Sequence, residues 1–126
     1  MIKYIELKTG HSDNGPAWIA RVAMSRSGQT LYFSEKALRR GGGQLTSGNY
    51  FDISNGDEYW VSGVKKRGGD RHGAGSGHVA IEASAVAEYF EEAGITSLPR
   101  GIIVVQDLPT PDPGRFVGIE NAPSQR

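Results

Sequence analysis

The clearest structural signal in this chain is the segment Tyr50-Phe51-Asp52-Ile53-Ser54-Asn55-Gly56-Asp57-Glu58-Tyr59-Trp60-Val61. Aromatic and β-branched residues, which strands favour, lie on both sides of a short polar centre. The Asn55-Gly56 pair in that centre tolerates the positive φ angles of a tight type I′ turn. The segment therefore predicts a β-hairpin with strands at residues 50–53 and 58–61.

A second hairpin is predicted on the N-terminal side of the first, at residues 17–34. Its first half alternates apolar and other residues, with one face formed by Trp18, Ala20, Val22 and Met24. This alternation is typical of a strand with one buried face. Residues 2–8 are β-prone and predict a further strand. Residues 35–40 predict a single helical turn that ends at the glycines 41–43.

The C-terminal half contains the one clear helix. Residues 84–93 predict a helix whose apolar stripe recurs at i, i+3, i+4 and i+7, at Val86, Tyr89, Phe90 and Ala93. Ser84 is the expected N-cap and Gly94 the expected stop. A short strand is predicted at residues 79–81. The continuous apolar run at residues 102–105 is typical of a strand covered on both faces.

These elements predict a β-dominated α+β fold: a small, strongly bent antiparallel sheet or open barrel, for which an SH3-like closure is one form, with one helix in the C-terminal half. Glycines 48, 56 and 63 would supply bends or bulges. We expect the core to include Trp18, Val22, Leu31, Phe33, Ile53, Val61, Ile81, Val86, Phe90 and Val104.

The domain boundary is expected near the start of a proline-rich tail. Residues 1–108 predict a single β-rich domain, and residues 109–126 predict an extended or partly disordered tail, because prolines interrupt regular structure there. Three apolar side chains in the tail could hold part of it to the domain: Phe116, Val117 and Ile119.

Composition excludes several classes of function. The chain has 126 residues, equal numbers of basic and acidic side chains at 14 each, and no cysteine. Disulfides, thiolate nucleophiles and sulfur-ligated zinc sites are therefore excluded, and no global basic field indicates nucleic acid.

Charges within residues 1–8 argue against a signal peptide, and no apolar run is long enough to span a membrane. We therefore expect a cytoplasmic protein without a membrane partner.

A glycine-rich basic loop is the predicted working surface. Residues 41–77 contain 11 of the 18 glycines and enclose the segment Lys65-Lys66-Arg67-Gly68-Gly69-Asp70-Arg71-His72. Its cations could hold phosphates while Trp60 stacks on a base, with support from Arg39 and Arg40. The alternative is a solvated hairpin loop without a ligand. The predicted binding residues are Lys65, Lys66, Arg67, Asp70, Arg71, His72, Arg39, Arg40 and Trp60.

Catalysis is the competing interpretation of the same loop. Asp70, Arg71 and His72 could act as a general base with a phosphate clamp in a small phosphoester-processing enzyme. Neighbouring strand residues alternate faces, however, and Asp70 could equally close a turn. No metal site or cofactor is predicted. We therefore favour a binding module for nucleic acid or an acidic protein surface, with a protein-binding inhibitor, immunity or regulatory protein as an alternative.

Several motifs resemble a family of short, uncharacterised bacterial proteins. They are Asn14-Gly15-Pro16-Ala17-Trp18-Ile19, Gly28-Gln29-Thr30-Leu31-Tyr32-Phe33, Gly48-Asn49-Tyr50-Phe51-Asp52, Glu58-Tyr59-Trp60-Val61-Ser62-Gly63-Val64-Lys65-Lys66 and Gly69-Asp70-Arg71-His72-Gly73-Ala74-Gly75-Ser76-Gly77. The resemblance covers roughly residues 3–94 and implies a compact bacterial domain without an activity or cofactor. The family tends to carry an aromatic residue where this chain has Gly73, which argues against a stacking aromatic in the loop.

Overall fold

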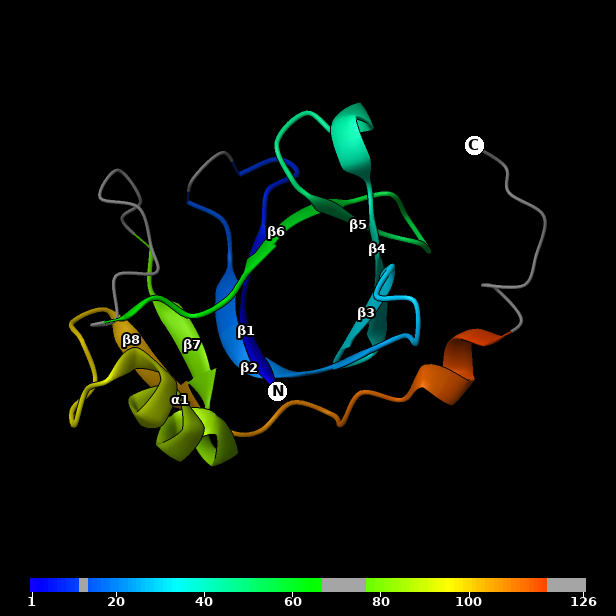
Figure 1. Cartoon of the computed structure of the whole chain (residues 1–126). Coiled ribbons are helices and arrows are strands. Elements are labelled where there is room, and N and C mark those ends of the chain that lie inside the picture. The colour runs from blue at the N-terminus through cyan, green and yellow to red at the C-terminus, as the bar shows by residue number, and fades with distance from the viewer. Residues whose placement is uncertain (12–13, 67–76, 118–126) are drawn as a thin grey trace.

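Six strands close into a barrel in the computed structural model, which describes residues 1–11, 14–66 and 77–117 (Figure 1). Each strand pairs antiparallel with the next in sequence, and the last pairs back with the first. The barrel is therefore a meander without an open edge. Its strands are β1 (Ile2–Leu7), β2 (Ala17–Met24), β3 (Thr30–Phe33), β4 (Lys36–Arg40), β5 (Tyr50–Asp52) and β6 (Glu58–Ser62).

A small extension is attached to one side of the barrel. Strand β7 (Val79–Glu82) pairs parallel with β2, and β8 (Ile102–Val105) pairs parallel with β7. The crossover between them contains α1 (Val86–Ala93), which lies beside both strands in Figure 1. The structure also contains short 3₁₀ turns, among them η1 (Gly42–Gln44), η3 (Ala83–Ala85) and η4 (Pro113–Phe116).

Strand β2 belongs to both parts because it changes neighbours along its length. Residues 17–19 pair with β7, whereas residues 22–24 pair with β3. At the fork, the backbone N–H of Arg21 donates to the Glu82 carboxylate at 2.7 Å, and the N–H of Leu108 donates to its second oxygen at 2.8 Å. Glu82 is only 5% exposed. A buried carboxylate thus takes the place of a strand neighbour where the sheet divides.

Three apolar clusters stabilise this arrangement. The barrel interior contains Ile5, Ala20, Val22, Leu31, Phe33, Leu38, Tyr50, Tyr59 and Val61. The cluster between the extension and α1 contains Ile2, Tyr4, Ala17, Ile19, Val79, Ile81, Ala85, Tyr89 and Ala93. On the outside of the barrel, Phe116 packs on Tyr32, with ring centroids 6.0 Å apart, and on Ala37. Alternate residues of β1 and β2 therefore serve two different cores.

The predicted fold class is confirmed. The protein is a β-dominated α+β domain, its bent antiparallel sheet closes completely, and its α-helix lies in the C-terminal half. Both predicted hairpins form. Gly94 ends α1 with a φ of +71°, and its N–H donates to the carbonyl of Phe90.

The prediction of a helical turn at residues 35–40 is wrong, because this segment forms β4. Ser34 and Glu35 make a two-residue connection, in which Ser34 has a positive φ of 52°, and Phe33 pairs with Lys36. Strand β4 has a neighbour on each side, β3 and β5. These two ladders satisfy its backbone, whereas an isolated turn of helix gains one hydrogen bond for several fixed residues.

The turn of the 50–61 hairpin is longer than the predicted type I′ turn. Of the Asn-Gly pair, only Gly56 has a positive φ, and its N–H donates to the carbonyl of Asp52. The buried Asp52 carboxylate accepts from the backbone N–H and the hydroxyl of Ser54, at 2.9 and 2.7 Å. These side-chain bonds stabilise a wider loop, so the strands end at Asp52 and begin again at Glu58.

Two further details at the extension differ from expectation. The run at 102–105 is not covered on both faces: Ile103 is 48% and Val104 46% exposed, and β8 lies at the edge of the sheet within the described residues. Ser84 is not the N-cap of α1; it lies in η3, and its N–H donates to Asp107.

Burial agrees with most of the expected core. The buried members are Val22, Leu31, Phe33, Val61 and Ile81. Partly buried members, which pack against the three clusters, are Trp18, Ile53, Val86 and Phe90. Val104 is outside the core. In the tail, Phe116 is buried and Val117 is exposed, whereas Ile119 lies outside the described residues.

Candidate functional site

The two ends of the barrel differ in chemistry. At one end, Leu7, Trp18 and Leu108 pack against the barrel core, and the Trp18 ring lies 5.3 Å from that of Phe33. At the other end, where β1, β3 and β5 begin, the structure has a cavity of about 360 Å³. We call this cavity the barrel mouth; it is lined by Lys3, Met24, Arg40, Gly42, Asn49, Tyr50 and Val61.

Strand alternation directs two cations into the barrel mouth. Lys3 shares the inward face of β1 with Ile5 and Leu7, and Arg40 shares the inward face of β4 with Leu38. Both cations lie near the ends of their strands, beyond the filled interior. Among the described residues that line the cavity, none is acidic. The barrel mouth is therefore a cationic site.

Tyr50 holds the guanidinium of Arg40 in position. An Arg40 Nη2 donates to the Tyr50 hydroxyl at 3.3 Å, and the guanidinium carbon lies 5.8 Å from the centre of the tyrosine ring. Tyr50 is only 5% exposed, so its ring is fixed by the barrel core. Within the described ranges, neither Arg40 nor Lys3 forms an ion pair with a carboxylate. Their charges are available to a ligand.

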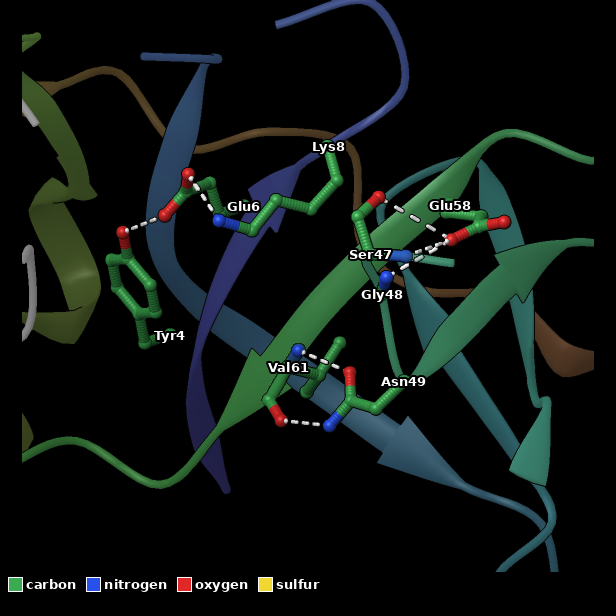
Figure 2. A network of polar contacts seen from close by, with 8 residues as sticks. All are labelled: Tyr4, Glu6, Lys8, Ser47, Gly48, Asn49, Glu58 and Val61. Carbon is green, nitrogen blue, oxygen red and sulfur yellow. Dashed lines mark hydrogen bonds and ion pairs between the residues drawn. The ribbon is translucent and has the colours of Figure 1, made fainter. Parts of the chain in front are cut away.

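Asn49 builds one wall of the barrel mouth (Figure 2). Its side-chain nitrogen donates to the carbonyl of Val61, and its side-chain oxygen accepts from the N–H of the same residue, both at 2.7 Å. The amide thus extends the β5–β6 ladder by one side-chain pair. These two bonds fix the orientation of the amide, which keeps one further N–H donor and one acceptor lone pair.

Glu58 anchors the β4–β5 loop, which contributes Gly42 and Asn49 to the cavity. Its carboxylate accepts from the backbone N–H groups of Ser47 and Gly48, each at 2.9 Å (Figure 2). It also accepts from the backbone N–H of Thr46 at 3.1 Å. These hydrogen bonds favour the ionised form and lower the pKa of Glu58 to about 2. The Glu58 carboxylate therefore fixes the β4–β5 loop, which forms part of the lining of the barrel mouth.

We expect Glu58→Gln to destabilise the fold at neutral pH, and this loss should disappear in acid. The carboxyl pKa is lowered from 4.5 to about 2 on folding, so its contribution is complete above pH 4.5 and is lost as the pH falls toward 2. Urea unfolding of both proteins between pH 7 and pH 2 measures the difference. A difference that stays constant over this range would contradict the role of the charge.

A second polar cluster lies on the outside of β1. The Tyr4 hydroxyl donates to the Glu6 carboxylate at 2.6 Å, and the Lys8 ammonium contacts its other oxygen at 3.1 Å (Figure 2). Glu6 is 5% exposed, and its cross-strand partner is Trp60. The charges of this cluster compensate one another, unlike those of the barrel mouth.

The structure separates the predicted site residues that it describes. Arg40 lines the barrel mouth, whereas alternation places Arg39 on the outer face of β4. Trp60 is on the outer face of β6 and is 43% exposed. Lys65 and Lys66 are exposed beyond the end of β6. The other predicted members, Arg67, Asp70, Arg71 and His72, lie outside the described residues.

Sequence reasoning missed Lys3 and Asn49. The signal for Lys3 was the alternation of residues 3, 5 and 7, which places a lysine in register with two inward apolar residues. Asn49 gave no comparable signal, because its role depends on a contact with Val61 across the hairpin.

Neither a metal centre nor a membrane span is found in the part of the chain that the structure describes. It contains no group of three or more histidine, aspartate or glutamate side chains arranged to hold a metal ion. No helix in the same ranges has the length and apolar character needed to cross a membrane. Comparisons with protein families, with curated proteins and with solved structures found no match to this chain.

Proposed function

We propose that this protein is a binding module that holds an anionic group in the barrel mouth. The observation that carries the proposal is a cavity of about 360 Å³ that receives the side chains of Lys3 and Arg40 and no acidic side chain from the described lining. Lys3 is partly buried and Arg40 is exposed, and both can form charge-assisted hydrogen bonds with a ligand of opposite charge. An anion is the ligand that this arrangement favours.

The partner could be a small molecule, nucleic acid or an acidic protein surface, since each supplies anionic groups. The exposed Lys65 and Lys66 would extend the contact with a larger partner, as would the remaining predicted residues of the 65–72 loop. A phosphoester-processing activity of Asp70, Arg71 and His72 stays a separate prediction. The described lining of the barrel mouth contains no carboxylate and no histidine.

The test is anion binding by Arg40→Gln and Lys3→Gln. We expect sulfate, titrated by calorimetry at low ionic strength, to bind roughly tenfold to a hundredfold more weakly to each variant, because each loses a charge-assisted hydrogen bond. Arg39→Gln is the matched control, since it removes the same charge one residue away on the outer face. Unchanged binding by Arg40→Gln, or an equal loss in Arg39→Gln, would exclude the barrel mouth as the site.

A further inference from the structure

The groups at the barrel mouth define the chemistry of the anion more narrowly. This inference rests on the proposed function, because it concerns the same cavity. We infer that the barrel mouth binds a terminal phosphate monoester, in preference to a phosphodiester or a carboxylate. A small phosphorylated molecule and the phosphorylated end of a nucleic acid strand both present this group.

The first argument is the inventory of hydrogen-bonding groups. Arg40 uses one Nη2 donor on Tyr50, which leaves its other N–H groups for a ligand. The Tyr50 hydroxyl accepts that bond, so its own proton can be donated. Lys3 adds an ammonium, and the amide of Asn49, which is held by Val61, keeps one further N–H donor. Most of the hydrogen-bonding groups that remain for recognition are donors, and they match an end group made of acceptor oxygens.

The second argument is charge. Lys3 and Arg40 bring two positive charges into one cavity without an acidic neighbour among its described lining residues. A phosphate monoester carries a charge of about −1.5 to −2 at pH 7. A phosphodiester or a carboxylate carries only one negative charge. The monoester is therefore the common biological end group that balances both cations.

The third argument is that the barrel interior is filled beneath the cavity. Below the barrel mouth the interior is filled by Ile5, Leu31 and Leu38, each 0% exposed, and apolar side chains close the opposite end. A ligand therefore enters from one end and cannot pass through. A terminal group can approach this closed end with its oxygens first, whereas both substituents of a phosphodiester must stay at the opening. The volume is near the lower end of the range of about 300 to 1,000 Å³ for small-molecule sites.

The experiment compares methyl phosphate with dimethyl phosphate, using the full chain and chemical-shift titration. We expect methyl phosphate to bind about tenfold more tightly at pH 7.5, because it can form a further charge-assisted contact. Lowering the pH to 5 should reduce its affinity about tenfold, since the second phosphate ionisation has a pKa of about 6. Sulfate, which stays doubly charged, is the control for titration of the protein.

Variants on two strands make the result independent of any one substitution. Arg40→Lys keeps the charge but loses the planar donor edge, and Lys3→Gln removes a charge from β1. Both should reduce the preference for methyl phosphate while the far-UV circular dichroism stays unchanged. If dimethyl phosphate or acetate binds as tightly as methyl phosphate and both variants weaken it, the anion site stands and the monoester inference is wrong. If no anion shows this dependence, both proposals fail.

Competition with oligonucleotides identifies the source of the phosphate. An eight-nucleotide strand with a 5′-phosphate that displaces methyl phosphate, when its 5′-hydroxyl counterpart does not, would support a nucleic-acid end as the ligand. Displacement by neither strand, with tight binding of methyl phosphate, would support a small phosphorylated molecule. Equal displacement by both strands would show recognition of the backbone and would overturn the inference.

Discussion

Replacing Leu31 with alanine is expected to lower the free energy of unfolding by about 3 to 5 kcal/mol, as for other fully buried leucines. Leu31 is 0% exposed and lies in the barrel interior with Ile5 and Leu38. A closed barrel cannot collapse around the missing atoms without moving its strands, so the cavity should persist. Urea unfolding followed by tryptophan fluorescence measures the change.

Leu31→Met is the matched control, because it keeps the volume and should cost less than about 1.5 kcal/mol. The alanine variant should also keep the wild-type dependence on urea, since the surface exposed on unfolding is almost the same. A loss below 1 kcal/mol in Leu31→Ala would mean that the barrel interior is less tightly packed than the structure shows.

Glu82→Ala is expected to cost about 3 kcal/mol, although a carboxylate in an apolar strand is often regarded as unfavourable. Its oxygens accept from the backbone N–H groups of Arg21 and Leu108, and the residue is 5% exposed. The substitution leaves both N–H donors without an acceptor at the fork of β2. Each donor that is left unsatisfied away from water costs about 1 to 3 kcal/mol. Chemical denaturation gives the total loss.

Glu82→Gln separates the hydrogen bonds from the shape of the side chain. Glutamine keeps one acceptor oxygen and presents its NH₂ group to the second backbone donor, so we expect a loss between those of wild type and Glu82→Ala. Hydrogen exchange locates the effect: the Arg21 and Leu108 amides should exchange faster in both variants. Unchanged protection of these two amides would contradict their dependence on Glu82.

Local pattern was sufficient to predict much of the fold. The hairpins at 17–34 and 50–61 could be predicted because alternation, turn residues and strand propensity agree over short distances along the chain. The helix was readable from its apolar stripe and from Gly94. The strand at Lys36–Arg40 could not be predicted from local pattern, because this segment is a strand only when β3 and β5 lie on either side of it.

The candidate site was less accessible from sequence than the fold. A cluster of cations in one loop is visible along the chain, whereas Lys3 and Arg40 line the same cavity only because the barrel closes. The exposure of Val104 was not predictable either, since an apolar run does not reveal whether other elements cover the two faces of its strand. Features that depend on strand order were therefore the ones that the sequence did not predict.

The meander has a consequence for how fast the barrel can fold. Five of the strand pairings in the barrel join strands that follow one another in sequence. These pairings form between residues that are close along the chain. The pairing between β1 and β6, in which Ile5 pairs with Val61, brings together the two ends of the barrel sequence. The entropic cost of loop closure is therefore greatest for the β1–β6 pairing. The rate of folding should depend most on the residues that form this pairing.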